Sequence, residues 1–369
     1  MRPATLVILA LGAAALACGS PPASATPPQP SAFELPGTAY GFFPSPPEAT
    51  TASVLKHFGD LGQHADFILV QPNLPWEYFT SDSSDEPQQL TDIRNQVLLA
   101  ELNGLGVAFV VDPLNGLNRR EFFGLPAGWT ASFATPEVRK AFTGFALWIA
   151  REFHPAYLGL ASEINTYADA HPEDFQDYVS LYREVYDAVK AETPDTDVFV
   201  TFQWEDLNNL LPGAAEGREP YHVNWDQVEA FEPELDLWVI SSYPFVAFRS
   251  GAQIPDDYYT PLLGRTSRPL AVAEGGYSSE SIGPFPGTPR DQVDYLSAIH
   301  DQIGERLRFW VYLLLTDFNQ DSYNQAMRQD GRSQEDMNTL GMFSAVGLQE
   351  ESGEPKPALE VWDRFRSER

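Results

Sequence analysis

Two glutamates are the residues of this sequence best suited to paired acid–base chemistry. Glu163 ends the apolar run YLGLASE (157–163), and Glu274 ends the apolar run LAVAE (270–274). Hydrolysis of a glycosidic bond with retention uses two such carboxyls about 5–5.5 Å apart, one protonated for the leaving oxygen and one ionised for attack. A shared apolar site can separate the two pKa values in this way. One glutamate alone is more simply a salt-bridging rim residue, so the interpretation depends on the pair.

The elements that must position these glutamates alternate along the chain as short apolar runs and longer amphipathic stretches. Apolar runs without polar alternation are typical of parallel strands buried on both faces. Strands are predicted at 38–43, 67–71, 107–112, 157–163, 198–204, 237–243, 270–274 and 309–317. Helices are predicted between them at 51–64, 88–104, 136–153, 173–193, 225–231 and 290–306, with a further segment at 256–263 and a closing helix at 358–366.

This order predicts an α/β fold, a single-domain (β/α)8 TIM barrel over residues 37–369. A doubly wound parallel sheet is the alternative, but it normally opens with a glycine-rich phosphate loop after the first strand. Here the first strand is followed by the proline-rich stretch 44–47. The active site of a TIM barrel lies at the carboxyl ends of its strands. Both glutamates are therefore expected at the mouth of the barrel.

Other polar and aromatic residues also follow the predicted strands, among them Glu205 at the end of the fifth. Amides and carboxylates hydrogen-bond hydroxyl groups, and Trp or Tyr rings stack on sugar C–H surfaces, so the set suits a neutral polyhydroxyl ligand. The residues expected to bind such a substrate are Asn73, Asp112, Asn165, Gln203, Trp204, Tyr243 and Trp310. Core packing is the alternative for Trp310, which lies early in its strand.

The two loops at 72–86 and 113–134 are long and rich in aromatic residues. Long ordered loops at this face of a barrel are often functional. Their aromatic residues are expected to line a groove for several sugar units, which favours endo-acting cleavage, or else to pack locally beneath the loops. These residues are Trp76, Tyr78, Phe79, Phe122, Phe123 and Trp129.

Several segments resemble the clan A glycoside hydrolases, most closely the endo-β-1,4-galactanase-like and related β-glycanase families. They are GLASEINTY (159–167), SSYP (241–244), LAVAEGGYSS (270–279), FWVYLLLTD (309–317) and GLQEESGEPKPALEVW (347–362). The resemblance covers residues 37–366. It implies that Glu163 is the general acid/base and Glu274 the nucleophile. It also implies that Tyr243 hydrogen-bonds the nucleophile, that Trp310 forms the floor of the sugar site, and that no cofactor takes part.

The sequence departs from the clan pattern at two places. The clan usually has Asn immediately before the acid/base, and here that position is Ser162. An arginine that the clan often carries near the end of the second strand is not evident. These departures leave open an altered substrate, weak activity, or a barrel that binds sugar without cleaving it.

The first residues have the pattern of a bacterial export signal. Arg2 precedes the apolar stretch 6–17, which is too short to span a bilayer because a spanning helix needs about 20 residues. Cys18 follows Ala-Leu-Ala, which resembles the lipobox of bacterial lipoproteins. We expect a lipid anchor at Cys18, the protein's one membrane contact, in the cell envelope outside the cytoplasm; an ordinary secretory signal is the alternative. Residues 19–36, rich in Pro, Ser and Ala, are expected to form a tether.

Composition limits the remaining functions. The chain of 369 residues has 23 basic and 52 acidic side chains and a net charge of −29, which argues against nucleic-acid binding. A single cysteine excludes a disulfide framework or a Cys-rich metal centre. The six histidines lack HxxxH or HxH spacing, and neither a GxSxG motif nor a P-loop occurs. No metal or other cofactor is expected, although calcium on the acidic surface is left open.

Together these patterns predict an exported retaining glycoside hydrolase. Its expected substrate is a neutral β-linked polysaccharide or oligosaccharide, cleaved by a two-glutamate double displacement. One alternative is a non-catalytic carbohydrate-binding surface lipoprotein on the same barrel, and another is a structural envelope protein without a ligand. The sequence does not indicate the sugar, the linkage or the oligomeric state.

Overall fold

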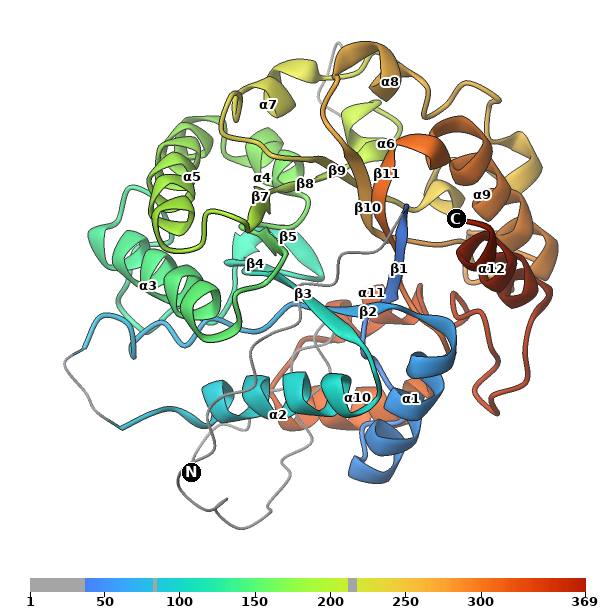
Figure 1. Cartoon of the computed structure of the whole chain (residues 1–369), viewed down its shortest axis with the longest axis horizontal. Coiled ribbons are helices and arrows are strands. Elements are labelled where there is room, and N and C mark those ends of the chain that lie inside the picture. The colour runs from blue at the N-terminus through green and yellow to red at the C-terminus, as the bar shows by residue number, and fades with distance from the viewer. Residues whose placement is uncertain (1–36, 82–84, 212–217) are drawn as a thin grey trace.

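The computed structural model describes residues 37–81, 85–211 and 218–369. The predicted signal, Cys18 and the tether lie outside these residues. The described chain forms a TIM-like barrel of parallel strands surrounded by helices, as predicted (Figure 1). The barrel strands are β1 (Ala39–Phe42), β2 (Phe67–Val70), β3 (Gly106–Val110), β6 (Tyr157–Gly159), β7 (Asp197–Phe199), β8 (Thr201–Gln203), β9 (Trp238–Ser242), β10 (Leu270–Gly275) and β11 (Leu307–Tyr312).

The barrel is nearly closed through a strand that is split in two. β7 and β8 are separated by Val200 alone, so they are two halves of the fifth barrel strand. β7 pairs with β6 on one side, and β8 pairs with β9 on the other. The first and last strands also pair in parallel, with Ala39 opposite Phe309. The sheet thus has the circular order that a TIM barrel requires.

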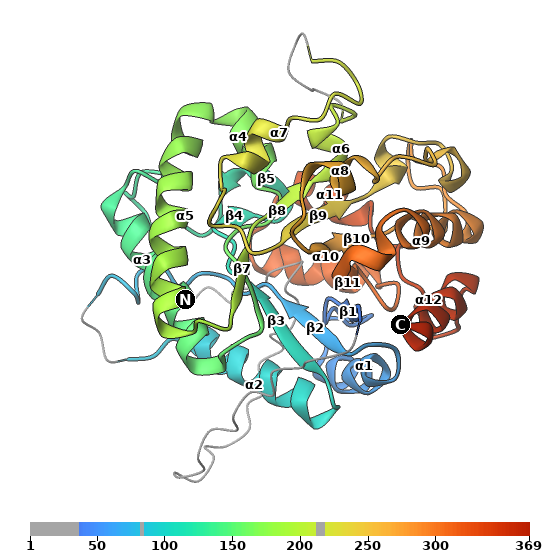
Figure 2. The same ribbon diagram turned by 45° about the horizontal axis from the view of Figure 1, so that its top comes forward.

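Helices cover the outside of the strands in both views (Figures 1 and 2). The last helix lies between α1 and α9, where it completes the ring. The longer helices are α1 (Thr51–His64), α2 (Gln88–Leu102), α3 (Pro136–Phe153), α5 (Pro172–Glu192), α9 (Pro289–Ile303) and α12 (Pro357–Glu368). Shorter helices follow the strands at α4 (Ile164–Ala170), α6 (Trp204–Leu207), α7 (Trp225–Glu229), α8 (Pro261–Arg265), η1 (Pro244–Val246), η2 (Gly251–Gln253) and η3 (Gly304–Arg306).

Two insertions were not predicted. After β11 the chain forms α10 (Gln320–Gln329) and α11 (Gln334–Gly341). After β3 it forms an antiparallel hairpin of β4 (Leu114–Asn115) and β5 (Asn118–Phe122), which we call the β4–β5 hairpin. The two residues between its strands are Gly116 and Leu117, and Asn115 pairs with Asn118 across the turn. This hairpin supplies an arginine to the mouth of the barrel.

The barrel interior opposite the mouth is filled by aromatic rings. The ring of Phe309 lies 5.9 Å from that of Phe67, 4.9 Å from Tyr157 and 5.7 Å from Phe199. A Cβ atom at Gly41 would lie 2.7 Å from the Phe67 ring. A side chain at Gly41 would clash with the Phe67 ring, so glycine at this position of β1 makes room for the ring.

Trp310 faces the other side of the sheet. Its ring lies 5.3 Å from that of Trp362 on α12, which also packs on Tyr40 and Phe42. The Trp362 indole N–H donates to the His64 carbonyl at 2.9 Å. Trp310 thus lies in the layer between strand and helix, where it is 1% exposed.

The loop aromatics divide between local packing and a pocket. Trp76 is 2% exposed, and its indole N–H donates to the Phe123 carbonyl at 2.8 Å. Phe79 packs on Phe145 of α3, with ring centroids 5.5 Å apart. The local-packing interpretation therefore holds for Trp76 and Phe79, whereas Phe122 and Trp129 line a pocket.

Candidate active site

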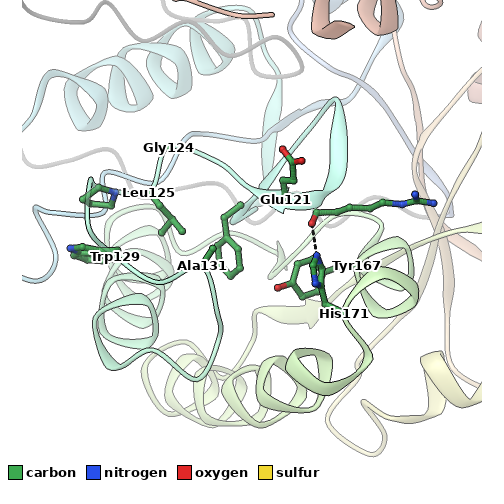
Figure 3. Close-up of a pocket in the computed structure, with 10 residues that line it drawn as sticks. Glu121, Gly124, Leu125, Trp129, Ala131, Tyr167 and His171 are labelled. Carbon is green, nitrogen blue, oxygen red and sulfur yellow. Dashed lines mark hydrogen bonds between the residues drawn. The ribbon is translucent and has the colours of Figure 1, made fainter.

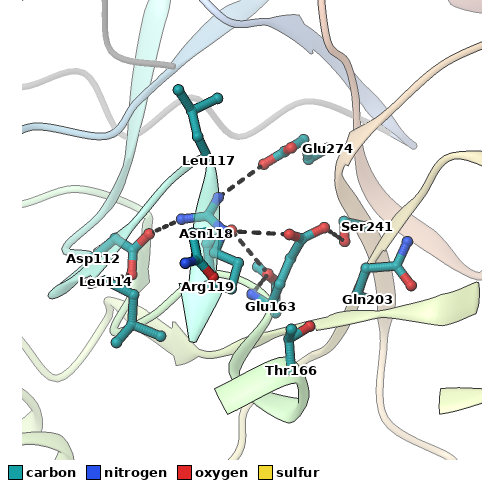
Figure 4. Close-up of polar contacts among 12 residues, drawn as sticks. Asp112, Leu114, Leu117, Asn118, Arg119, Glu163, Thr166, Gln203, Ser241 and Glu274 are labelled. Carbon is teal, nitrogen blue, oxygen red and sulfur yellow. Dashed lines mark hydrogen bonds and ion pairs between the residues drawn. The ribbon is translucent and has the colours of Figure 1, made fainter. Parts of the chain in front are cut away.

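The two predicted glutamates converge at the mouth of the barrel (Figure 4). Glu274 lies on β10 and is 3% exposed. Glu163 directly precedes α4. Arg119 contacts both: its Nε lies 3.3 Å from Glu163 Oε2, and its Nη2 lies 3.7 Å from Glu274 Oε2. The carboxylates are thus within reach of a single guanidinium.

Glu163 has an unusual backbone conformation. β6 ends at Gly159, and Glu163 adopts φ 51° and ψ 43°, a left-handed conformation that is uncommon outside glycine. Its N–H donates to Thr201 Oγ1 at 2.8 Å, and its Oε1 accepts from Ser241 Oγ at 2.5 Å. Strain of this kind persists where surrounding contacts determine it, typically at functional sites.

Glu274 accepts a hydrogen bond from Tyr243, the contact that the clan resemblance implies. The Tyr243 hydroxyl lies 2.6 Å from Glu274 Oε1. Burial and then the negative charge of Glu163 raise the pKa of Glu274 to about 7, while Arg119 and the Tyr243 hydroxyl act to lower it. Glu274 is therefore only partly ionised near neutral pH.

Arg119 is the site residue that the sequence analysis missed. It lies on β5, and its side chain is 4% exposed. Asp112 forms its closest ion pair and also accepts from Gln71 Nε2 at 2.6 Å. Burial disfavours the charge of Arg119, but the Asp112, Glu163 and Glu274 carboxylates raise its pKa and keep it cationic. Three carboxylates against one cation leave an excess of negative charge, which a proton on the glutamate pair relieves.

In the part of the chain that the structure describes, two atoms of the ion pair between Arg119 and Glu274 lack a hydrogen bond. Arg119 Nη2 and Glu274 Oε2 are buried without a hydrogen-bond partner among the described residues. A buried polar atom without a partner costs roughly 1–3 kcal/mol. The two atoms face each other at 3.7 Å, so a ligand hydroxyl could satisfy both.

Glu205 is a buried carboxyl that helps to position Tyr243. It is fully buried and accepts from Gln203 Nε2 at 2.7 Å, Ser242 Oγ at 2.7 Å and the Tyr243 N–H at 2.9 Å. Burial raises the pKa of Glu205. Its bond to the Tyr243 backbone holds the tyrosine whose hydroxyl contacts Glu274. Its place at the end of the fifth strand was the sequence signal for this role.

Some residues predicted to bind substrate do not reach the carboxylates, and these assignments are corrected. Trp310 packs outward against α12, because alternate residues of a strand face opposite sides. Trp204 is fully buried beside Trp225 and Tyr259. Asn165 is fully buried because the first turn of α4 directs it towards β8, where its Oδ1 accepts from the Gln203 N–H at 2.8 Å.

The other predicted residues have mixed positions. The Gln203 side chain accepts from the Asp206 N–H at 2.6 Å and so caps α6, besides its bond to Glu205. Asp112 holds Arg119, so it acts on the site through that residue. Asn73 is half-buried in the loop after β2. Ser162, which stands where the clan has Asn, is buried, and its hydroxyl lies 3.3 Å from Thr201 Oγ1.

Among the described residues, no helix is long and apolar enough to cross a membrane. No group of three or more His, Cys, Asp or Glu side chains in residues 37–81, 85–211 and 218–369 is arranged to hold a metal ion.

Comparison with solved structures gives similarity at the level of the fold. The exo-β-1,4-mannosidase Op5Man5 from Opitutaceae bacterium strain TAV5 superposes with a TM-score of 0.65 at 14% identity, over 90% of this chain and 59% of that one. This chain thus spans well under two thirds of the mannosidase. GH5_18 from Bifidobacterium longum gives a TM-score of 0.61 at 14% identity, over 90% and 79% of the chains. A variant of that protein was also solved in complex with Manb1-4GlcNAc.

Fungal β-1,4-galactanases are similar as well, with a TM-score of 0.55 at 13% identity over 89% of this chain and 94% of theirs. No protein-family model matches the sequence, and no curated protein matches it. The chain is structurally similar to the clan A glycoside hydrolases and shares their TIM-barrel fold.

Proposed function

We propose that this protein is a retaining glycoside hydrolase acting on a neutral β-linked polysaccharide or oligosaccharide. The observation that carries the proposal is the arrangement of Glu163 and Glu274 around one guanidinium, with the Tyr243 hydroxyl 2.6 Å from Glu274. Retaining hydrolysis needs two neighbouring carboxyls of different protonation. Burial and the negative charge of Glu163 raise the pKa of Glu274 to about 7, so Glu274 is partly protonated near neutral pH and substrate binding must favour its ionised form.

In the first step, protonated Glu163 donates to the glycosidic oxygen as the bond to the leaving sugar breaks. Ionised Glu274 attacks the anomeric carbon and forms a glycosyl ester. Substrate binding must therefore leave Glu163 protonated and Glu274 ionised. The Tyr243 hydroxyl and Arg119 both favour ionised Glu274, as their effect on its pKa shows.

In the second step, ionised Glu163 takes a proton from water as the water oxygen attacks the anomeric carbon. The bond to Glu274 breaks, the sugar leaves with retained configuration, and both carboxyls return to their starting states. Arg119 then pairs with whichever glutamate is ionised, because it contacts both.

A neutral substrate fits the charges of the site. The carboxylates Asp112, Glu163, Glu205 and Glu274 outnumber the one arginine, so an anionic sugar would be repelled. A sugar hydroxyl can donate to Glu274 Oε2 and accept from Arg119 Nη2, the two unpaired atoms. The resemblance to a mannosidase and to galactanases also favours β-mannans and β-galactans as first substrates.

The test is reducing-end release from galactans, mannans, xylans and β-glucans. We expect release from at least one of them and a loss of at least about 10³-fold in Glu274→Ala and in Glu163→Ala, within the range that single acid–base or nucleophilic groups contribute. Azide separates the roles. It should give an α-glycosyl azide with Glu274→Ala, which lacks the nucleophile, and a β-glycosyl azide with Glu163→Ala, which still forms the glycosyl ester.

Glu360→Gln, an exposed change on α12, is the control and should leave activity unchanged. The same azide anomer from both alanine variants would contradict the assigned roles. Full activity in Glu274→Ala would refute the mechanism.

A second candidate is a carbohydrate-binding protein without turnover. One observation favours it: Ser241 Oγ and Arg119 Nε already donate to the two Glu163 oxygens, so neither oxygen can deliver a proton to a glycosidic oxygen without giving up a contact. This candidate predicts oligosaccharide binding by calorimetry in wild type and Glu274→Ala alike, with no reducing ends released by either.

We also propose export and lipid anchoring at Cys18, supported by the apolar stretch 6–17 and the Ala-Leu-Ala before the cysteine. Metabolic labelling with palmitate should mark the wild type and not Cys18→Ala. Labelling of both, or of neither, would contradict the anchor.

A further inference from the structure

A pocket of about 510 Å³ lies beside the β4–β5 hairpin (Figure 3). We propose that it is a distal subsite for the same substrate chain, which holds a neutral sugar unit against Trp129. The inference rests on the proposed function and adds a second point of contact. Its lining includes Arg120, Glu121, Phe122, Trp129, Tyr167 and His171.

The aromatic rings that line the pocket pack on buried rings outside it. Trp129 makes an edge contact with buried Trp76 at 6.4 Å, and Trp76 is itself hydrogen-bonded to the Phe123 carbonyl. Phe122 packs on Phe133 at 4.6 Å. Such support keeps the ring in place before a ligand arrives, which lowers the entropic cost of binding.

Asp174 ties the elements around the pocket together. Its carboxylate accepts from the Tyr167 hydroxyl at 2.7 Å, from the Phe133 N–H at 3.0 Å and from the Ser132 hydroxyl. One side chain on α5 thus joins α4 to the loop that carries Trp129. The pocket walls are therefore preformed.

The polar groups of the pocket suit hydroxyls and not a charged ligand. Arg120 and Glu121 bring one charge of each sign. His171 Nε2 lies 2.8 Å from the Arg120 carbonyl, so Nε2 carries a proton and donates to it. The Trp129 indole N–H has no partner in the described part of the chain and remains a donor. This donor and the Glu121 carboxylate, an acceptor, lie beside aromatic rings, which matches a sugar.

The pocket and the site around Glu163 share two elements, β5 and α4. β5 carries Arg119 to the carboxylates and, one residue later, Arg120 to the pocket. α4 begins directly after Glu163 and carries Tyr167, and His171 follows its last residue. This continuity is why we assign the pocket to the chain being cleaved and not to an unrelated ligand.

The test measures binding separately from cleavage. Full-length Glu274→Ala is titrated by calorimetry with β-1,4-mannan and β-1,4-galactan oligosaccharides of two to six units, with and without Trp129→Ala. We expect Trp129→Ala to weaken the longest oligosaccharides about tenfold, roughly the worth of one aromatic contact, and to leave disaccharides unchanged. Trp148→Ala, a half-buried tryptophan on α3 away from the pocket, is the matched control.

Each outcome decides the proposal. An equal loss at every length, or no loss, overturns the subsite, and a second independent sugar-binding event overturns its link to the cleaved chain. Trp129→Phe should restore most of the affinity, which excludes simple misfolding as the cause. If Trp129→Ala weakens only long oligosaccharides but wild type releases no reducing ends, the subsite stands and the hydrolase proposal fails.

Discussion

The two ends of this barrel bury different kinds of groups: charged and polar side chains at the mouth, and aromatic rings at the opposite end. At the mouth, Glu163 and Glu274 face one guanidinium, and two polar atoms stay unpaired. At the opposite end, Phe67 and Phe309 lie among other rings, close-packed around a glycine that leaves room for them. The mouth holds groups that would be more stable in water, whereas the aromatic end holds groups that water would exclude.

This contrast indicates which end sets stability and which end sets chemistry. Aromatic burial stabilises the fold at any pH. Buried carboxylates destabilise it in a pH-dependent way, because a raised pKa means that the folded state disfavours the ionised form. The same destabilisation supplies a proton-holding pair near neutral pH. The two ends should therefore respond differently to mutation and to pH.

The largest expected effect on stability is at the aromatic end. Phe309→Ala should lower the free energy of unfolding by about 3–5 kcal/mol, because it removes a fully buried ring that three others contact. Urea unfolding at pH 5, 7 and 9 should give the same loss each time, since no partner of this ring titrates there. A loss that varied with pH would contradict the conclusion that the stability contributed by the aromatic end is independent of pH.

The next effect is a gain of stability at the mouth. The folded pKa of Glu274 is about 7, above its ordinary value, so its ionisation destabilises the fold as pH rises from about 4.5 through 7. Glu274→Gln removes this penalty. We expect the variant to be more stable than wild type at pH 8, by up to about 3 kcal/mol, and equal to it near pH 4. Glu360→Gln controls for the lost charge, and a gain already present at pH 4 would contradict the explanation.

The smallest effect is on the pH profile of activity. The Tyr243 hydroxyl favours ionised Glu274, so Tyr243→Phe should raise the pKa of that carboxyl further. The acid limb of kcat/KM, expected near pH 7 in wild type, should move up by about one unit, the worth of a hydrogen bond to a charged group. Phe309→Ala should not move this limb. A shift to lower pH in Tyr243→Phe would reverse the assigned role.

The residues that sequence reasoning misplaced have a common cause. Trp310 and Trp204 were assigned to the mouth because they lie in or just after apolar runs, but a run does not show which side of the sheet each residue faces. Period-two alternation places Trp310 against α12. β6 ends at Gly159, so Asn165 belongs to a helix and not to a strand end.

Arg119 was missed for a different reason. The clan often carries an arginine near the end of the second strand, and none is evident there in this sequence. In the structure the arginine comes instead from a hairpin inserted after the third strand. Asn115 and Gly116 are turn-forming residue types and indicated a turn at this place. No local pattern, however, shows that a hairpin residue will turn back into the barrel mouth.

The sequence by itself determined the barrel and the meeting of Glu163 and Glu274. Eight apolar runs separated by amphipathic stretches leave few ways to bury both sheet faces, and parallel strands bring their carboxyl ends to one rim. Apart from the Tyr243 contact that the resemblance implied, only the tertiary structure decided what surrounds that pair: the arginine between the carboxylates and the pocket beside the hairpin. These depend on contacts between segments far apart in the chain, whose side-chain directions local periodicity does not specify.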